Sequence, residues 1–319
     1  MSIHEDAKTI LETALRACRP DEAVRRALEG RDFAGGRVFL VAAGKAAWQM
    51  AHCASRVLGE RLTEGVVVTK YGHDMGAIAR CRVYEGGHPV PDENSFRGTK
   101  AAMELVADLS REDTVVFLLS GGGSALFESP LIPGEELAEL TAAMLASGAD
   151  IVEMNTVRKR LSAVKGGRFA QLCAPAKVYA VVLSDILGDP LDMIASGPAC
   201  PDSSTCADAL AVAEKYHLPV SPQARQLLTE ETPKQLDNVK TVITGSVREL
   251  CTAAAGACRA LGYRPVLLTD RLCCEAREAG SFLSSIARTH DGDEESLAFL
   301  AGGETVVHLT GSGLGGRNQ

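Results

Sequence analysis

Short apolar runs alternate with amphipathic stretches along most of this chain. Residues 3–18 and 20–29 carry apolar side chains at helical spacing and predict two helices. Continuous apolar runs of strand length follow at 37–43, 65–70, 114–120, 177–184, 239–244, 264–269, 297–303 and 304–310. Helical stretches separate most of these runs, and strands without polar alternation are typical of parallel sheets that are buried on both faces. The pattern predicts an α/β protein with mostly parallel sheets covered by helices.

A segment rich in proline and charge interrupts the alternation at 219–238, and a fresh strand begins at Val239. We therefore expect two lobes, an amino-terminal α/β domain over 1–236 and a second α/β domain over 237–319. The last residues form an apolar strand, a glycine-rich loop and an arginine, after which the chain stops. The neighbours of such a strand should lie further along the chain, so we expect the second lobe to be truncated at its carboxyl end.

Charge and composition exclude several classes of partner. The chain has 319 residues, with 33 lysines and arginines against 41 aspartates and glutamates and a net charge of −8. A protein that wraps a polyanion needs a basic surface, so we expect no nucleic-acid partner. Residues 1–20 lack the basic and apolar regions of a signal peptide, and no apolar run has the length of a membrane span. We therefore expect no membrane partner and a cytoplasmic location.

The strongest local signal for chemistry is a glycine-rich loop, SGGGSALF, directly after an apolar run. Three consecutive glycines let the backbone turn its N–H groups toward one point, and a helix can begin at the serine that follows. The candidate anion cradle comprises Ser120, Gly121, Gly122, Gly123 and Ser124. The alternative is a tight strand-to-helix turn without a ligand.

Two further loops carry candidate polar groups. Lys45 follows Gly44 at the end of an apolar run, where it can neutralise a phosphate or a carboxylate, although a lone lysine is more often a solvated surface charge. His88 lies at the tip of a proline-bracketed turn, GGHPVPDENS, and a structural role for it is as open as a catalytic one. Asp92 or Asn94 can cap the helix that follows.

An acidic loop, LSDILGDPLDMIASGP, follows the apolar run at 177–184. Its carboxylates, on Asp185, Asp189 and Asp192, suit Mg²⁺, which takes one or two of them together with water and phosphate oxygens. One of them could instead accept a hydroxyl proton. The alternative is a set of turn-forming and helix-capping aspartates.

Positive charge is concentrated in one segment of this acidic chain, NTVRKRLSAVKGGRFAQL. Its cations are Arg158, Lys159, Arg160, Lys165 and Arg168. A small anionic substrate is one reason for such a cluster, and a solvated helix face is the other.

Taken together, six motifs of this chain resemble those of the glycerate kinase family of the MOFRL type. The motifs are AAGKAAWQMA, GGHPVPDENS, LLSGGGSALF, NTVRKRLSAVKGGR, LSDILGDPLDMIASGP and GGETVVHLTGSGLGGRNQ. These are the class II glycerate kinases, which phosphorylate D-glycerate at its 2-hydroxyl. The resemblance covers nearly the whole chain, in order. It departs at the end, because in the family the GGRNQ stretch opens a further α/β segment. Some members carry the name hydroxypyruvate reductase.

The resemblance implies that D-glycerate and ATP–Mg²⁺ meet in a cleft between two α/β lobes. Lys45 and Arg317 match the essential cations of the family. The loop Ser120–Ser124 matches its phosphate-side turn, and Asp185 and Asp189 lie in its acidic loop. We expect one aspartate, with Asp185 as the metal candidate, to hold Mg²⁺ and the other to orient or deprotonate the 2-hydroxyl. The two cations should stabilise the charge of the moving phosphoryl group.

We expect a second group of residues to bind the substrate, with Arg158 or Arg168 gripping the glycerate carboxylate. This group comprises Gly44, His88, Asn155, Arg158, Lys165 and Arg168. Two other functions stay open: an NAD(P)-dependent hydroxypyruvate reductase and a non-catalytic sugar-acid-binding protein. The G-x-G-x-x-G pattern that a nicotinamide enzyme needs occurs only at 311–316, without room for a complete βαβ unit. A homodimer is the candidate assembly.

Overall fold

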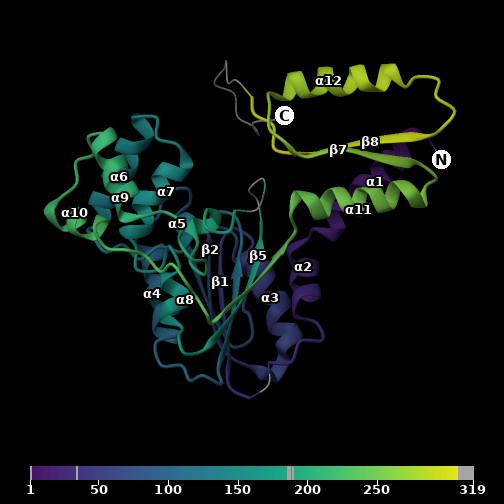
Figure 1. Ribbon diagram of the computed structural model, residues 1–319. Helices are drawn as coiled ribbons and strands as arrows, with labels where there is room; N and C mark the ends of the chain where they lie inside the picture. Colours follow the sequence, from purple (N-terminus) through teal and green to yellow (C-terminus); the bar gives the residue numbers. More distant parts are fainter. Residues whose placement is uncertain (1, 34, 185–187, 189, 308–319) are drawn as a thin grey trace. The chain divides into compact units, whose positions relative to one another are not determined.

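A computed structural model of the protein describes residues 2–33, 35–184, 188 and 190–307 (Figure 1). The chain folds into two compact units. The larger, here called the sheet unit, comprises Val24–Leu183 and Pro190–Thr244. The smaller, here called the terminal unit, comprises the described parts of 1–23, 184–189 and 245–319.

The boundary between these units differs from the expected one between 236 and 237. Strand β6 (Val239–Thr244) pairs in parallel with β5 (Lys177–Leu183), so its backbone hydrogen bonds tie it to the sheet unit. The amino-terminal helix α1 (Ile3–Ala17) packs instead on α11 (Val247–Ala260) of the terminal unit. The prolines at 219–238 interrupt the chain but do not end the first sheet.

The sheet unit is built on six parallel strands in the order β3-β2-β1-β4-β5-β6. Its other strands are β1 (Val38–Ala43), β2 (Leu62–Lys70), β3 (Cys81–Gly86) and β4 (Thr114–Leu119). The chain runs outward from β1 to β3 and then returns to the other side of β1 with β4. This is the order of doubly wound α/β folds, in which ligands bind beyond the carboxyl ends of the strands where the direction reverses, here between β1 and β4.

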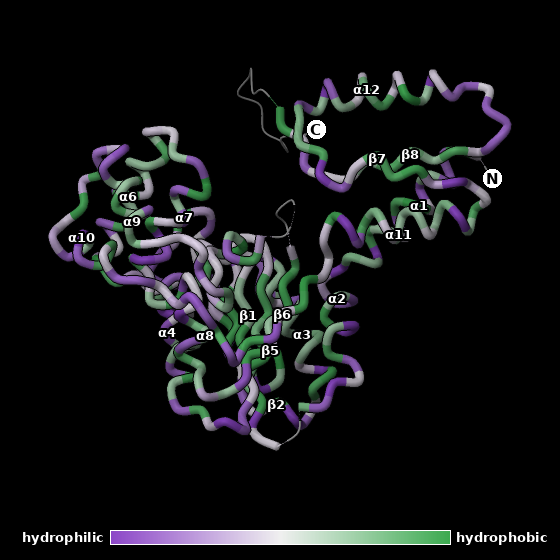
Figure 2. The backbone as a smooth tube through the Cα atoms, in the orientation of Figure 1, coloured by the Kyte–Doolittle hydropathy of each residue, from purple (hydrophilic) through white to green (hydrophobic). Residues whose placement is uncertain are grey.

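Helices cover both faces of this sheet (Figure 1). Helix α3 (Ala47–Leu58) lies on one face and packs on β1, β2 and β4, while α4 (Glu93–Leu105) packs on β2 and β3 from the other. Every residue of β1 and of β4 is buried, and Figure 2 shows hydrophobic residues along the central strands. Three aromatic rings, those of Phe117, Phe127 and Phe169, pack together with centroids 4.9–5.5 Å apart.

A helical subdomain stands beside the sheet within the same unit (Figure 1). Its core consists of apolar side chains from α6, α7, α9 and α10, including Leu140, Val157 and Leu228. The other helices here are short or flank the sheet, and α2 crosses from the terminal unit into the sheet unit at Val24. The bounds are α2 (Pro20–Leu28), α5 (Gly123–Leu126), α6 (Gly134–Ala146), α7 (Ile151–Arg160), α8 (Arg168–Leu172), α9 (Cys206–Lys215) and α10 (Pro222–Leu228), with 3₁₀ turns η1 (Gly59–Arg61) and η2 (Ile194–Ser196).

The terminal unit contains two parallel strands, β7 (Arg264–Leu272) and β8 (Leu297–Gly303), with α11 packed on both. Helix α12 (Ala276–Thr289) connects the strands. The strand expected at 304–310 is not formed in its described part, where Val306 makes only an isolated bridge to Glu275. Among the described helices, none combines the length and the apolar character that crossing a membrane requires.

The α/β class, the parallel pairing and seven of the expected strands are confirmed. The expected helices at 3–18 and 20–29 are also confirmed, as α1 and α2. Strand β3 was not predicted. It lies at the edge of the sheet, and its sequence CRVYEG includes the charged residues Arg82 and Glu85, so it lacks the continuous apolar run that marks its neighbours.

A buried carboxylate ties the start of β4 to the start of β1 and yields a prediction. Asp113 is 2% exposed and accepts hydrogen bonds from the amide and guanidinium of Arg37 at 2.8–3.2 Å. The Arg37 guanidinium holds the pKa of Asp113 well below its ordinary value. Asp113→Asn should therefore lower the free energy of unfolding by about 2 kcal/mol near neutral pH, as measured by urea denaturation.

The same substitution predicts a pH dependence. Because the folded-state pKa of Asp113 is depressed, its stabilisation is complete above the unfolded-state pKa of about 3.9 and is lost as the pH falls toward the folded-state value. The difference between the wild type and Asp113→Asn should stay constant above about pH 5 and shrink below about pH 4. Glu112→Gln, at the exposed neighbouring position, is the control. A difference that persists unchanged to pH 3 would contradict this account.

Candidate active site

The loops that follow β1 and β4 touch at the point where the strand order reverses. Gly44 has φ +121°, and a Cβ added there would lie 2.3 Å from the hydroxyl oxygen of Ser120. The amide of Lys45 donates to the carbonyl of Gly121 at 2.8 Å, and the amide of Ala46 donates to the Ser120 hydroxyl at 3.1 Å. Glycine is therefore required at 44, and the two loops form one rigid edge.

Lys45 and His88 flank the glycine-rich loop at this edge. A Cβ added to Gly122 would lie 2.9 Å from Cδ2 of His88 and 3.1 Å from Cγ of Lys45. Lys45 is exposed, and its ammonium finds no hydrogen-bond or ion-pair partner among the described residues. A cation without a partner in this part of the chain, beside a glycine turn, can bind an anion.

The glycine-rich loop has the backbone that an anion cradle needs. Gly122 caps the short helix α5 in a left-handed conformation, with φ +87°. The amides of Gly121 and Gly122 have no acceptor within the described part of the chain. These two N–H groups beside Lys45 can both donate to the oxygens of one phosphate.

A separate set of hydrogen bonds fixes the turn that carries His88. Asp92 caps α4 by accepting from the amide of Ser95 at 2.9 Å, and it also accepts from the amide of Gly87 at 3.1 Å. The hydroxyl of Tyr71 donates to Asp92 at 2.6 Å. Burial alone would raise the pKa of Asp92, but the hydrogen bonds from Tyr71 and the two amides lower it. The capping role predicted for Asp92 is confirmed.

Ser124 lies at the end of a buried chain of polar groups. Its hydroxyl is 3.2 Å from that of Ser196, which donates to Oδ1 of Asn155 at 2.8 Å. The guanidinium of Arg158 donates to the carbonyl of Ser124 at 3.0 Å and lies 3.7 Å from the carboxylate of Glu128. The structure thus brings Asn155 and Arg158, both predicted to bind substrate, to the glycine-rich loop.

Lys165 and Arg168, the other two cations predicted to bind substrate, contact protein groups. The ammonium of Lys165 is fully buried, 2.5 Å from the carboxylate of Glu128, and burial lowers its pKa to about 8. The guanidinium of Arg168 donates to the carbonyls of Arg160 and Ser162. Their predicted contacts with substrate would therefore compete with contacts inside the protein.

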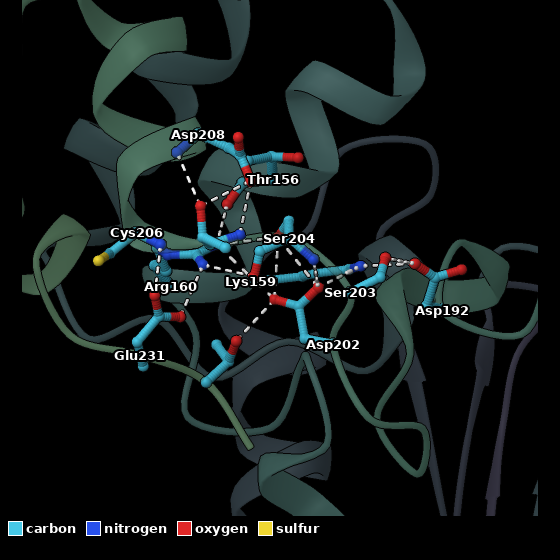
Figure 3. Close-up of polar contacts among 12 residues, drawn as sticks. Thr156, Lys159, Arg160, Asp192, Asp202, Ser203, Ser204, Cys206, Asp208 and Glu231 are labelled. Carbon is cyan, nitrogen blue, oxygen red and sulfur yellow. Dashed lines mark hydrogen bonds and ion pairs between the residues drawn. The ribbon is translucent and has the colours of Figure 1, made fainter. Parts of the chain in front are cut away.

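Lys159 and Arg160 belong to a buried ion network (Figure 3). The ammonium of Lys159 lies 2.9 Å from Asp202 and 3.5 Å from Asp192, and the guanidinium of Arg160 lies 3.3 Å from Glu231. Both cations are fully buried. Neither a solvated helix face nor an exposed anion site describes them, because they join α7 to the segment that precedes α9 and to Glu231, which follows α10.

Three predicted catalytic residues, Asp185, Asp189 and Arg317, lie outside the described residues. Asp192, further along the acidic loop, is described and accepts a hydrogen bond from the hydroxyl of Ser203 at 2.7 Å. The described residues contain no group of three or more histidine, cysteine, aspartate or glutamate side chains arranged to hold a metal.

The fold and this edge define a doubly wound α/β protein with a lysine and a glycine-rich loop where the strand order reverses. A family model described as Domain of unknown function (DUF4147) matches residues 6–229. The chain is 51% identical to the D-glycerate 2-kinase of Thermotoga maritima, over 100% of this chain and 77% of that protein. It is 36% identical to the glycerate 2-kinase of Pyrococcus horikoshii, over 100% of this chain and 78% of that protein. The chain belongs to the glycerate kinase family, which confirms the resemblance.

Solved structures agree with this. The crystal structure of a glycerate kinase from Thermotoga maritima superposes with a TM-score of 0.94 at 51% identity, over 98% of this chain and 77% of that chain. A crystal structure of a protein from Pyrococcus horikoshii gives 0.91 at 36% identity, over 100% of this chain and 78% of that chain. A relative from Agrobacterium vitis named putative hydroxypyruvate reductase is 40% identical over 89% of this chain and 76% of its own length.

Sequence reasoning missed Ser196, which links Asn155 to Ser124. The residue lies in the motif MIASGP but was not singled out there. Its backbone has φ +62°, and the sequence around a non-glycine residue gives no signal of that conformation.

The buried pair of Lys165 and Glu128 generates a stability prediction. Lys165→Met leaves the fully buried carboxylate with Arg158, 3.7 Å away, as its remaining cation among the described residues. We expect a loss of about 3–5 kcal/mol in the free energy of unfolding, measured by urea denaturation. The double variant Lys165→Met/Glu128→Gln removes the uncompensated charge and should recover most of that loss. Additive losses would show instead that the pair itself stabilises the fold.

Proposed function

We propose that this protein transfers the γ-phosphoryl group of ATP to the 2-hydroxyl of D-glycerate in the cytoplasm. The observation that carries the proposal is the Lys45 ammonium, unpartnered among the described residues, beside a glycine-rich loop in a chain 51% identical to a D-glycerate 2-kinase. Phosphoryl transfer asks a protein mainly for positioning and for neutralisation of charge. Both are available at this edge.

The nucleotide is assigned to the loop after β4. The amides of Gly121 and Gly122, which have no acceptor in the described part of the protein, can donate to phosphate oxygens. Lys45 can neutralise the charge that moves with the γ-phosphoryl group. His88 borders the same space. Arg317 is proposed as the second cation on the basis of the family motif that it matches.

The acidic loop after β5 is assigned to the hydroxyl and the metal. The carboxylates of Asp185 and Asp189 have the oxygen chemistry that Mg²⁺ requires, and Asp185 is the proposed ligand. When bound, Mg²⁺ would neutralise phosphate charge. The other aspartate accepts the proton of the 2-hydroxyl. The 2-hydroxyl oxygen of glycerate then bonds to the γ-phosphorus, and the bond between the γ-phosphorus and the bridging oxygen that ADP keeps is broken. Arg158 is the proposed partner of the glycerate carboxylate.

A nicotinamide-dependent reductase is the competing function, because some relatives bear that name. In dinucleotide-binding folds with this strand order, the first strand leads into a G-x-G-x-x-G turn. Here β1 leads into Gly44-Lys45-Ala46-Ala47, which has one glycine followed by a cation. The residues after β1 therefore favour the kinase.

One pair of assays tests the proposal. The protein is incubated with D-glycerate and ATP–Mg²⁺, and ADP release is followed by a coupled assay. In parallel, oxidation of NADH and NADPH is followed with hydroxypyruvate. ADP release that depends on D-glycerate, with product phosphorylated at the 2-position by NMR, supports the kinase. Nicotinamide oxidation without ADP release would replace it with the reductase.

Lys45→Ala gives the sharpest prediction from this assignment. Turnover with D-glycerate and ATP should fall by at least about a hundredfold, which is the scale for removing one group that stabilises transition-state charge. The melting temperature should hardly change, because the ammonium has no partner among the described residues. Lys100→Ala, an exposed lysine on α4, is the matched control. Near-wild-type turnover of Lys45→Ala would make this lysine a surface charge.

A further inference from the structure

Three consecutive residues beside the glycine-rich loop adopt left-handed backbone conformations. Ala195 has φ +51°, Ser196 has φ +62° and Gly197 has φ +65°. Only the last is a glycine, and left-handed conformations are unfavourable for alanine and serine. Strained backbone of this kind persists only where the surroundings hold it, and it clusters at functional sites.

The turn that leads into α8 holds these residues in place. The amide of Gly166 donates to the carbonyl of Ser196 at 3.0 Å, and the amide of Gly167 donates to the carbonyl of Gly197 at 2.7 Å. Ser196 is fully buried, and the methyl group of Ala195 packs against Gly123, where an added Cβ would lie 2.6 Å away. These contacts hold the strained segment in place and keep Ser196 next to the glycine-rich loop.

The hydrogen bonds of Ser196 have a defined direction. Its single hydroxyl proton goes to Oδ1 of Asn155, at 2.8 Å. The carboxamide of Asn155 is oriented by its contact with Met193. Its Nδ2 donates toward the sulfur of Met193, which can accept a weak hydrogen bond but cannot donate one to a carboxamide oxygen, so Oδ1 faces Ser196. The Ser196 oxygen can then only accept, so the Ser124 hydroxyl, 3.2 Å away, must be the donor between the two serines.

This direction has a consequence for the ligand. With its proton committed to Ser196, the Ser124 oxygen has only lone pairs left for a ligand. Before the 2-hydroxyl proton passes to the aspartate of the acidic loop, this oxygen can accept a hydrogen bond from that hydroxyl, but it cannot donate to a carbonyl oxygen. The neighbouring Arg158, which donates to the carbonyl of Ser124 at 3.0 Å, supplies positive charge for a carboxylate beside the same residue.

We propose that Ser196 is a specificity-determining residue that acts through Ser124, making the site select a 2-hydroxy acid over the corresponding 2-keto acid. Ser196 is a positioning residue, and the group that meets the substrate is the Ser124 hydroxyl oxygen. The proposal rests on the proposed function, and it explains how the site would bind glycerate more tightly than hydroxypyruvate.

Calorimetric titration of the whole chain with D-glycerate and with hydroxypyruvate tests this. The wild type should bind D-glycerate at least about tenfold more tightly. Ser196→Ala frees the Ser124 proton to rotate, so the preference should fall to about threefold or less through tighter binding of hydroxypyruvate. A purely structural role would weaken both ligands together. Ala195→Gly relieves backbone strain but keeps the hydroxyl, and it should retain the wild-type preference.

A double-variant comparison separates action through Ser124 from any other route. Ser124→Ala alone should abolish the preference, and Ser196→Ala added to it should change nothing further. Equal losses for both ligands in Ser196→Ala, or a further change in the double variant, would overturn the inference while leaving the kinase proposal to its own ADP-release assay. A wild type that binds neither acid would overturn both.

Discussion

The close contact between Gly44 and Ser120 is the constraint on which the rest of the site depends. Any side chain at 44 would collide with the Ser120 hydroxyl, at 2.3 Å, so the loops after β1 and β4 can meet only because this residue is a glycine. The contact fixes where Lys45 leaves its strand and where the three glycines begin. In this doubly wound sheet β1 and β4 are neighbours, and Gly44 allows the loops that follow them to pack directly on each other.

The lysines and arginines around that edge are of two kinds, buried and paired or exposed and unpaired among the described residues. Lys159, Arg160 and Lys165 are fully buried and paired with carboxylates, so their charges are neutralised within the fold. Such pairs stabilise little in net terms, but breaking one of them leaves an unpaired buried charge, which is strongly destabilising. They therefore fix the position of α7 and of the segments packed on it, and they leave the binding of anions to other cations, such as the exposed Lys45.

The sequence predicts well those features that local composition determines. Buried strands such as β1, β4 and β5 are continuous apolar runs, and the glycine-rich loop is visible as a run of three glycines, the residue that best tolerates the left-handed conformation at Gly122. Features that depend on distant partners escape such reasoning. For Lys159 the sequence left an anion site and a solvated helix face as the alternatives, because Asp202, which neutralises it, lies 43 residues further along the chain. Strand β3 escaped because an edge strand has no fully apolar pattern.

The left-handed turn at Ala195 and Ser196 shows why the polar details of a site are harder still to predict. A serine hydroxyl in solution can rotate and can serve as donor or acceptor, so its presence in a motif does not define its chemistry. Here the direction follows from a chain of neighbours that ends at a sulfur atom, since Met193 can accept but not donate. Because Nδ2 of Asn155 donates to that sulfur, Oδ1 of Asn155 accepts the proton of Ser196, and the Ser196 oxygen accepts the proton of Ser124. Specificity at the loop is thus set by a residue that need not touch the ligand, and backbone strain holds that residue in place.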